Sequence, residues 1–355
     1  MSLARVIDLR SDTVTLPKAE MIEAIRNAPL GDSIMGEDPT VNQLEKKAAE
    51  LLGMEAALLV TSGTMANQIT LMSLCNRGEE VIMGEDSHIY TLEGAAAAVV
   101  AQVQIRTIEV LDGIYDASKI ESRIQTGDIQ RPKTSLICLE NTYNLNKGQI
   151  VSLENMKEIR AVANKHSIPV YLDGARLFNA AIELGVTLDV ICREVDAVQF
   201  CLTKGLGCPI GSILAGTKEF IETATINRQR LGGGMRQAGI IAAPAIYALD
   251  HMIDRLSEDH KKAKLLAASL STVDGIKIQA EDVQTNIVSP IISHEDWDSK
   301  LLIEFLSTKG IKVKNIGEKQ VRMVVHYQIT DEDIQFVVSA FEEFSSSVQI
   351  KTTVH

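Results

Sequence analysis

The sequence lacks most features that mark nucleic-acid-binding, secreted or membrane-spanning proteins. Its 355 residues carry 35 basic and 47 acidic side chains, a net charge of -12, which argues against a broad grip on phosphate backbones. The five cysteines are odd in number and form no C-x-x-C pair, so we expect reduced thiols in a cytoplasmic protein. The longest apolar run, residues 238–249, contains Pro244 and falls short of the ~20 residues that cross a bilayer. We therefore expect neither nucleic acid nor a membrane as a partner.

Other absences narrow the class further. Charged side chains at Arg5, Asp8 and Arg10 interrupt the segment that a secretory signal would need to be apolar. No G-x-G-x-x-G follows a strand, because the glycine-rich run 205–211 has the wrong spacing and contains Pro209, which disfavours a nicotinamide-dependent dehydrogenase. No His, Cys, Asp and Glu cluster has the spacing of metal ligands, so we expect no metal.

What the sequence does have, between residues 40 and 215, is an alternation of short apolar runs with longer stretches of helical period. This pattern predicts an α/β domain with a mostly parallel sheet covered by helices. Helices are expected at 40–52, 65–75 and 153–166. The seven strand candidates are 56–60, 80–83, 103–109, 135–140, 169–172, 197–202 and 211–215.

The pattern changes in the last third of the chain. A long helical connection at 242–270 is followed by strands expected at 276–278, 285–292, 311–316 and 320–326 and by helices at 299–308 and 331–344. We predict a large domain at 1–245 and a small α+β domain at 246–355. Residues 1–20 are expected to form an arm on the small domain or on a neighbouring subunit.

Three sites along the large domain combine into one chemical requirement. The turn 61–64 joins a strand to a helix and suits a phosphate, Asp173 ends a strand, and Lys204 ends the next one. Each feature alone could have a purely structural explanation: a capped turn at 61–64, a helix cap at Asp173 and a solvent-facing side chain at Lys204. Together Gly63 with Thr64, the carboxylate and the amine match a phosphate cradle, a partner for a pyridinium nitrogen and a Schiff-base lysine, so we predict pyridoxal 5′-phosphate. His88 could stack on the ring, although a lone histidine after a strand is as often a loop residue.

Several longer strings make the chain resemble low-specificity L-threonine aldolases, from residue 6 to about 345. The matching strings are Ile7 to Thr15, Gly31-Asp32, Gly36 to Thr40, Ser62 to Gln68, Asp86-Ser87-His88, Glu140-Asn141-Thr142, Asp173 to Arg176, Lys204-Gly205-Leu206 and Leu231 to Gln237.

The resemblance implies fold type I of the pyridoxal-phosphate enzymes, a homotetramer with sites between subunits, and a carbon–carbon lyase. The expected reaction is cleavage of threonine, allo-threonine and related β-hydroxy-α-amino acids to glycine and an aldehyde, a step of threonine catabolism and glycine biosynthesis. Catalytic roles would fall to Lys204, His88 and Asp173, with Gly63 and Thr64 binding phosphate. The substrate carboxylate would be held by Ser11, Arg176 and Arg322, and Arg236 would reach the phosphate of a neighbouring subunit's cofactor.

One departure concerns the proton of the substrate hydroxyl. Many members of the family have a histidine where this chain has Tyr143, and a phenol is a poor base near neutral pH. Tyr143 could still donate or relay a hydrogen bond to the substrate, and His88, or a water that it holds, is our candidate base.

A second reaction stays open at this point. The same pocket in the same family could racemise an amino acid such as alanine or eliminate a β-substituent, because the reaction depends on which α-carbon bond is held upright. A non-enzymatic protein is disfavoured, since it would leave Asp173, Arg176 and Lys204 at strand ends without a reason.

Overall fold

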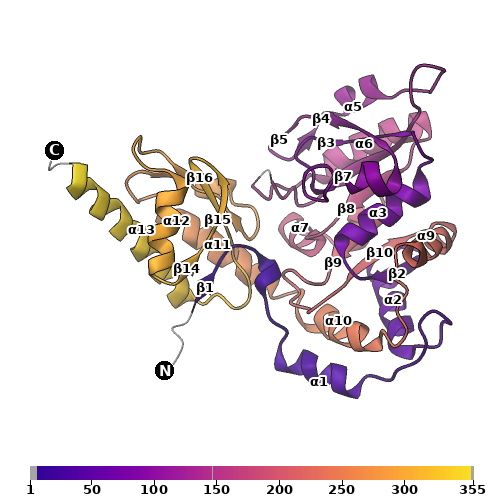
Figure 1. Cartoon of the computed structure of the whole chain (residues 1–355), viewed down its shortest axis with the longest axis horizontal. Helices are drawn as coiled ribbons and strands as arrows, with labels where there is room; N and C mark the ends of the chain where they lie inside the picture. The colour runs from indigo at the N-terminus through magenta and orange to yellow at the C-terminus, as the bar shows by residue number, and fades with distance from the viewer. Residues whose placement is uncertain (1–5, 146, 353–355) are drawn as a thin grey trace. The chain divides into compact units, whose positions relative to one another are not determined.

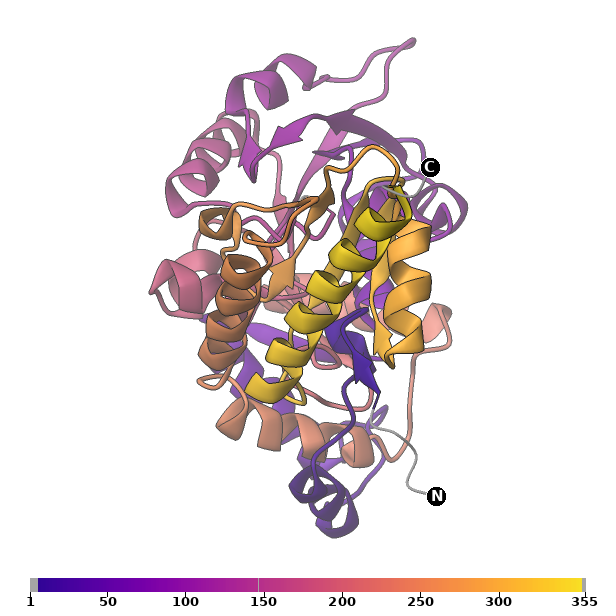
Figure 2. The same ribbon diagram turned by 90° about the vertical axis from the view of Figure 1, so that its left-hand side faces the viewer.

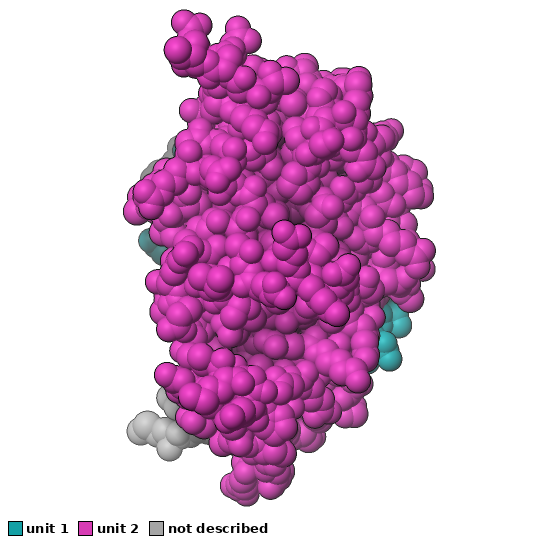
Figure 3. All heavy atoms as spheres, turned by 90° about the vertical axis from the view of Figure 1, so that its right-hand side faces the viewer, with its two compact units in different colours: residues 1–15, 254–355 teal, residues 16–253 magenta. Residues whose placement is uncertain are grey.

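The computed structural model describes residues 6–145 and 147–352, and these residues form two compact units (Figure 3). The larger unit is Leu16–Ile253, and the smaller combines the described parts of Met1–Thr15 and Asp254–His355. Each has a hydrophobic core of its own.

The unit boundary differs from the sequence-based division at residue 245. Helix α10 (Gly239–His251) continues past that residue and packs against α1 (Ala19–Asn27) and α2 (Pro39–Leu52) of the larger unit. The expected helical connection at 242–270 is two helices, because the chain turns between α10 and α11 (Leu256–Leu270).

The larger unit is built on a seven-stranded sheet in the order β2-β10-β9-β8-β7-β3-β4 (Figure 1). All neighbouring pairs from β9 to β4 are parallel, whereas β10 runs antiparallel to both β2 and β9. The expected mostly parallel sheet is confirmed, with β10 as its one reversed strand. The strands are β2 Ala56–Val60, β3 Glu80–Gly84, β4 Gln104–Ile108, β7 Thr134–Glu140, β8 Val170–Asp173, β9 Ala197–Cys201 and β10 Ser212–Gly216.

Helices cover this sheet, and its central strands are buried along their whole length, which explains their nearly continuous apolar sequences. The remaining helices of the unit are α3 Gly63–Leu74, α4 His88–Thr91, the π-helix η2 Ala97–Ala101, α5 Ala117–Arg123, α6 Leu153–His166, α7 Leu177–Leu184, α8 Leu188–Cys192 and α9 Lys218–Arg230. A small hairpin, β5 Val110–Leu111 with β6 Ile114–Tyr115, follows β4.

Local signals explain why α2 begins and ends where the sequence predicts. The Asp38 side chain accepts hydrogen bonds from the backbone N–H groups of Thr40 and Val41, and Pro39 occupies the first turn, where it costs no hydrogen bond. Gly53 ends the helix with a φ of 64°, a left-handed conformation that glycine adopts without strain.

The smaller unit is a sheet in the order β11-β13-β16-β12, with β15 on β16, packed against three helices. Figure 2 shows α13 beside α11 and α12, as their contacts also require. The strands are β11 Ile276–Lys277, β12 Ile287–Val288, β13 Ile291–Ile292, β14 Ile311–Lys312, β15 Lys314–Gly317 and β16 Gln320–Val324, and the remaining helices are η3 Ala280–Asp282, α12 Ser299–Thr308 and α13 Asp331–Thr352. Two expected strands, 285–292 and 311–316, are each divided in two, the first at Pro290, which has no N–H for a ladder.

Residues 6–15 belong to the smaller unit. Strand β1 (Ile7–Asp8) pairs in parallel with β14, a short helical turn η1 (Asp12–Val14) follows, and Ile7 and Leu9 are buried in the core of this unit. Among the described residues, no helix is both long enough and apolar enough to cross a membrane.

Candidate active site

A cavity opens at the carboxyl ends of β2, β8 and β9 in the larger unit, where open α/β sheets bind ligands. The fold brings all three predicted elements into it: the turn after β2, Asp173 and Lys204. Its lining residues are Ser62, Gly63, Thr64, Asn67, His88, Asp173, Ala175, Gln199, Cys201, Thr203 and Lys204.

The turn after β2 is shaped for an anion. Ser62 caps α3 by accepting a hydrogen bond from Met65 N at 3.1 Å, so the first backbone N–H groups and the positive end of the helix dipole lie beside the cavity. A Cβ at Gly63 would lie 2.9 Å from Cys201 Sγ, so a side chain there would push the turn away from β9. A phosphate group fits this cradle.

Asp173 is a buried carboxylate held only by neutral donors among its described hydrogen bonds. Oδ1 accepts from Gln199 Nε2 at 2.5 Å and from Ala175 N at 3.1 Å, and Oδ2 accepts from Asn67 Nδ2 at 2.9 Å. Amides fix the position of the carboxylate and leave its charge in place. A protonated ring nitrogen beside it would be stabilised, which is what the predicted cofactor offers.

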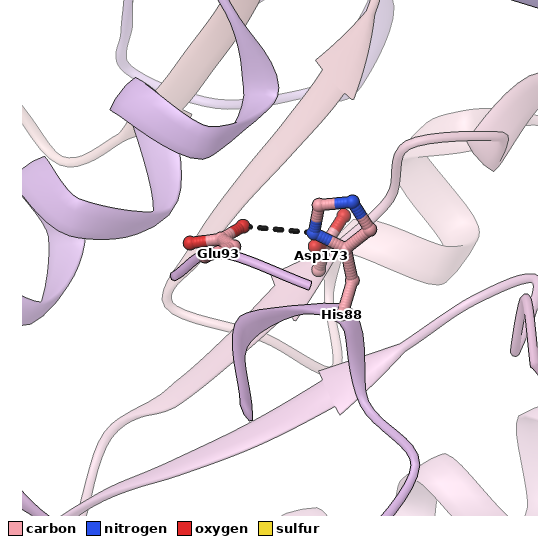
Figure 4. Close-up of side chains that lie close together, drawn as sticks. All are labelled: His88, Glu93 and Asp173. Atoms are coloured by element: carbon pink, nitrogen blue, oxygen red, sulfur yellow. Dashed lines mark hydrogen bonds and ion pairs between the residues drawn. The ribbon is translucent and has the colours of Figure 1, made fainter. Parts of the chain in front are cut away.

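His88 lies next to this carboxylate and is fixed at two points. Its backbone N–H donates to Glu140 Oε2 at 2.7 Å, and its ring Nδ1 lies 2.9 Å from Glu93 Oε1 (Figure 4). The ligand atoms of His88, Glu93 and Asp173 all lie within 4.8 Å of one another, close enough to bind a metal ion. The sequence showed no such cluster because its members come from separate segments that only the fold brings together.

Glu140 is a further acid in this region, at the end of β7. It is buried and accepts hydrogen bonds from the backbone N–H groups of His88 and Asn144 at 2.7 and 2.9 Å. Burial, together with the negative charge of Asp173, raises the pKa of Glu140 well above the ordinary value of 4.5.

Two predicted arginines of the larger unit lie outside the cavity lining. Arg176 follows Ala175, is buried, and donates from Nη1 to Asn144 Oδ1 at 3.2 Å. Arg236 lies in the loop between α9 and α10 and forms an ion pair with Asp32 at 2.9 Å. The Arg236 side chain is more than half exposed.

Tyr143 is not brought to the cavity either. Its side chain is fully buried, its hydroxyl accepts a hydrogen bond from Asp86 N at 3.1 Å, and its ring packs edge-on against Tyr115. The phenol lies against Gly84, where a Cβ would come within 2.3 Å of the hydroxyl oxygen. This geometry gives Tyr143 contacts with Asp86, Tyr115 and Gly84 within the chain.

Ser11 and Arg322 lie in the smaller unit, on neighbouring segments. Ser11 caps η1 by accepting a hydrogen bond from Thr13 N at 3.2 Å, and Arg322 is buried on β16. The two segments are joined where Val324 N donates to Leu9 O at 2.8 Å.

Sequence reasoning assigned no role to several polar residues that hold the site together. Gln199 had a signal, because it is a lone amide in the otherwise apolar strand β9. Asn67 and Glu140 lie in the strings that the chain shares with threonine aldolases, but no role was predicted for them. Nothing in the sequence around Glu93 predicts its role, and it only follows a short helix.

The fold and this cavity define an α/β protein with a candidate ligand site at the carboxyl ends of the strands in its large unit. The family model described as "Beta-eliminating lyase" matches residues 8–292, so the chain belongs to that family.

Named relatives agree with this assignment. The chain is 41% identical over 352 residues to low-specificity L-threonine aldolase 1 of Arabidopsis thaliana, covering 97% of this chain and 98% of the relative. It is 38% identical to the low specificity L-threonine aldolase of Escherichia coli K12, covering 96% and 99%. The resemblance seen in the sequence is confirmed.

Solved structures confirm the fold class. The Leishmania major threonine aldolase matches with a TM-score of 0.81 at 19% identity, covering 96% of this chain and 99% of that one. The serine palmitoyltransferase of Sphingomonas wittichii matches with a TM-score of 0.77 at 19% identity, covering 97% and 88%. At these identities the likeness shows the shared fold alone.

Proposed function

We propose that this protein is a pyridoxal-phosphate-dependent carbon–carbon lyase that cleaves L-threonine and L-allo-threonine to glycine and acetaldehyde. The names of the relatives over nearly the full chain support the reaction. The observation that carries the proposal is the cavity, which gathers an amine at Lys204, a buried carboxylate at Asp173 and the phosphate-binding turn at 62–64.

The residues of the cavity fit the cofactor one group at a time. Lys204 would hold it covalently through its aldehyde, and the N–H groups of Gly63 and Thr64 would hold its phosphate. Asp173 would keep its ring nitrogen protonated, and the His88 ring would stack on it. When bound, pyridoxal phosphate supplies an electron sink for the α-carbon of the amino acid.

The chain's own groups then select the bond that breaks. Cleavage between Cα and Cβ requires that the β-hydroxyl lose its proton, and His88 is our candidate to accept it, directly or through a water. A positioned base of this kind contributes roughly 10²- to 10⁴-fold to the rate. We propose that Ser11, Arg176 and Arg322 bind the substrate carboxylate, because paired guanidinium groups fix a carboxylate in one orientation.

The proposal extends to the oligomeric state, the cellular location and the metabolic role of the protein. We propose a cytoplasmic homotetramer with sites between subunits, in which Arg236 reaches the phosphate of a neighbouring subunit's cofactor. The reaction would degrade threonine and supply glycine. Tyr143 would then act through the backbone at Asp86, where its hydroxyl binds.

An aldehyde assay tests the reaction. Purified protein loaded with pyridoxal phosphate is given L-threonine or L-allo-threonine, and acetaldehyde is followed by coupling it to alcohol dehydrogenase. Release of acetaldehyde with equimolar glycine supports the proposal. Cofactor binding with no aldehyde from either substrate, and with pyruvate from serine or D-alanine from L-alanine, would replace the aldolase with an eliminating lyase or a racemase.

A further inference from the structure

Glu93 is a buried carboxylate that organises the groups around His88. It follows the short helix α4, and its side chain is fully shielded from solvent. Oε1 accepts from Asn67 Nδ2 at 2.6 Å and lies 2.9 Å from His88 Nδ1, and Oε2 accepts from Gln68 Nε2 at 2.7 Å. Three side chains from two helices therefore converge on one acid.

The contact with Glu93 determines which nitrogen of His88 carries the proton. An ionised carboxylate can only accept hydrogen bonds, so Nδ1 must be the N–H of a neutral ring. Nε2 is then left with its lone pair, on the side of the ring away from Glu93 (Figure 4). A base that accepts a proton within the cavity needs this tautomer, because the opposite one has no lone pair at Nε2.

Asn67 links the same acid to Asp173. Its two amide hydrogens go to Glu93 Oε1 and Asp173 Oδ2, and its Oδ1 accepts from the Tyr171 hydroxyl at 2.7 Å. Because all three contacts are used at once, the amide has one orientation that satisfies them. Asn67 thereby fixes the distance between the two carboxylates, and the ring of His88 lies close to both.

The charges that face His88 come from three segments. Burial is the largest single effect and lowers the pKa of the ring, whereas the hydrogen bond to Glu93 and the charge of Glu93 raise it. The charges of Asp173 on β8 and Glu140 on β7 act in the same direction, and the net effect is a pKa above the usual 6.5. Lys204 lines the same cavity as the opposite charge.

We propose that Glu93 is a positioning residue that holds His88 in the Nδ1–H tautomer, with Nε2 as the proton acceptor for the substrate hydroxyl. The proposal rests on the proposed function for the identity of the substrate, but the tautomer is a property of the protein itself. A carboxylate that orients a histidine in this way is the arrangement used in hydrolytic triads.

The first test reads the tautomer without any substrate. Nitrogen-15 chemical shifts of the His88 ring, assigned with a His88→Gln variant, distinguish a protonated Nδ1 from a protonated Nε2. We expect Nδ1–H in the unaltered protein above the ring pKa. A ring protonated at Nε2 would overturn the proposal whether or not the protein cleaves threonine, and so separates it from the proposed function.

The second test removes the charge of Glu93 while keeping its shape. In Glu93→Gln we expect a mixture of ring tautomers, a His88 pKa shifted downward, and kcat/KM for threonine lower by about 10- to 100-fold. Glu80→Gln is the matched control, because Glu80 is an equally buried carboxylate in the same unit, outside the cavity lining. It should keep the His88 shifts and kcat/KM.

Two outcomes of this comparison contradict the proposal. One is a Glu93→Gln protein with unchanged His88 shifts and an unchanged acidic limb of the pH profile. The other is an equal loss of kcat/KM in both variants, which would mean that any buried carboxylate in this unit matters only for folding. If Glu93→Gln does not fold, the shifts of the unaltered protein still decide.

Discussion

The large unit buries carboxylates at both ends of its sheet, but their partners differ between the two ends. At the amino end of β3, Glu80 forms an ion pair with Arg106 Nε at 2.6 Å and accepts from Gln104 Nε2 at 2.9 Å. At the carboxyl end of β8, the described hydrogen bonds to Asp173 come from amides alone, and Glu93 and Glu140 lie near it.

This difference in partners indicates which end of the sheet binds a ligand. A buried charge costs several kcal/mol unless a partner compensates it, and Glu80 has its partner in the chain. The cavity end places the carboxylates of Asp173, Glu93 and Glu140 near His88, and Lys204 lines the same cavity. Glu80 is therefore compensated by a cation of the chain, whereas Asp173 is positioned by amide donors, an arrangement that a cationic group of a ligand would complete.

Replacing Asp173 should have the largest effect on function. Asp173→Asn keeps the shape but removes the charge opposite the ring nitrogen, and we expect kcat to fall by about 10²- to 10³-fold. The thermal midpoint should fall little, because the amide retains an acceptor for one of its donors. A loss of folding with no change in kcat of the remaining folded protein would break the comparison, since it would make Asp173 a structural acid like Glu80.

The pH profile should show the raised pKa of His88. The base form of a histidine exists above its pKa, so kcat/KM should drop by about tenfold per pH unit below that pKa. Because the carboxylates near the cavity raise it, we expect the acidic limb above pH 6.5, the ordinary value. Measurement of kcat/KM from pH 5 to 9 checks this. An acidic limb below pH 6 would mean that these acids are not charged together with the bound cofactor.

At the opposite end of the sheet, Glu80→Gln should affect stability and leave chemistry intact. Removing the charge leaves the partly exposed Arg106 without its partner, and we expect the free energy of unfolding to fall by about 2 kcal/mol. Urea denaturation measures the loss, with kcat/KM as the control. A large fall in kcat/KM at unchanged stability would reverse the roles of the two ends.

The smallest effect is expected at the free edge of β2. Leu59 N donates to Glu45 Oε1 at 2.8 Å, and Leu59 O accepts from Arg228 Nη1 at 2.8 Å, so side chains satisfy the edge strand. Glu45→Ala should lower the free energy of unfolding by about 1 kcal/mol. Glu50→Ala, on the exposed face of the same helix, is the control and should change little.

The sequence predicted the larger unit well because its elements carry their own signals. The α2 helix has Asp38, Pro39 and Gly53 at its ends, and the buried strands are apolar throughout. The reversed direction of β10 had no such signal, since a short apolar run reads the same for either direction. In the small unit, strands of two residues were merged because periodicity needs a longer segment.

The sequence likewise predicted some residues of the candidate site and missed others. Lys204, Asp173 and the turn at 62–64 were predictable because each stands at a strand end, where position implies exposure to a ligand. Glu93 was not, because its role depends on hydrogen bonds to Asn67, Gln68 and His88 that no spacing encodes. The burial of Tyr143 likewise follows from packing against Gly84 and Tyr115.

The covalent attachment at Lys204 is the most direct test of the whole account. The protein is incubated with pyridoxal phosphate, reduced with borohydride, digested and analysed by mass spectrometry, beside Lys204→Ala and Lys218→Ala, the latter at an exposed position on α9. The account predicts a cofactor label on the peptide containing Lys204, retained in Lys218→Ala and lost in Lys204→Ala. A label that persists in Lys204→Ala, or that forms only on another lysine, would contradict it.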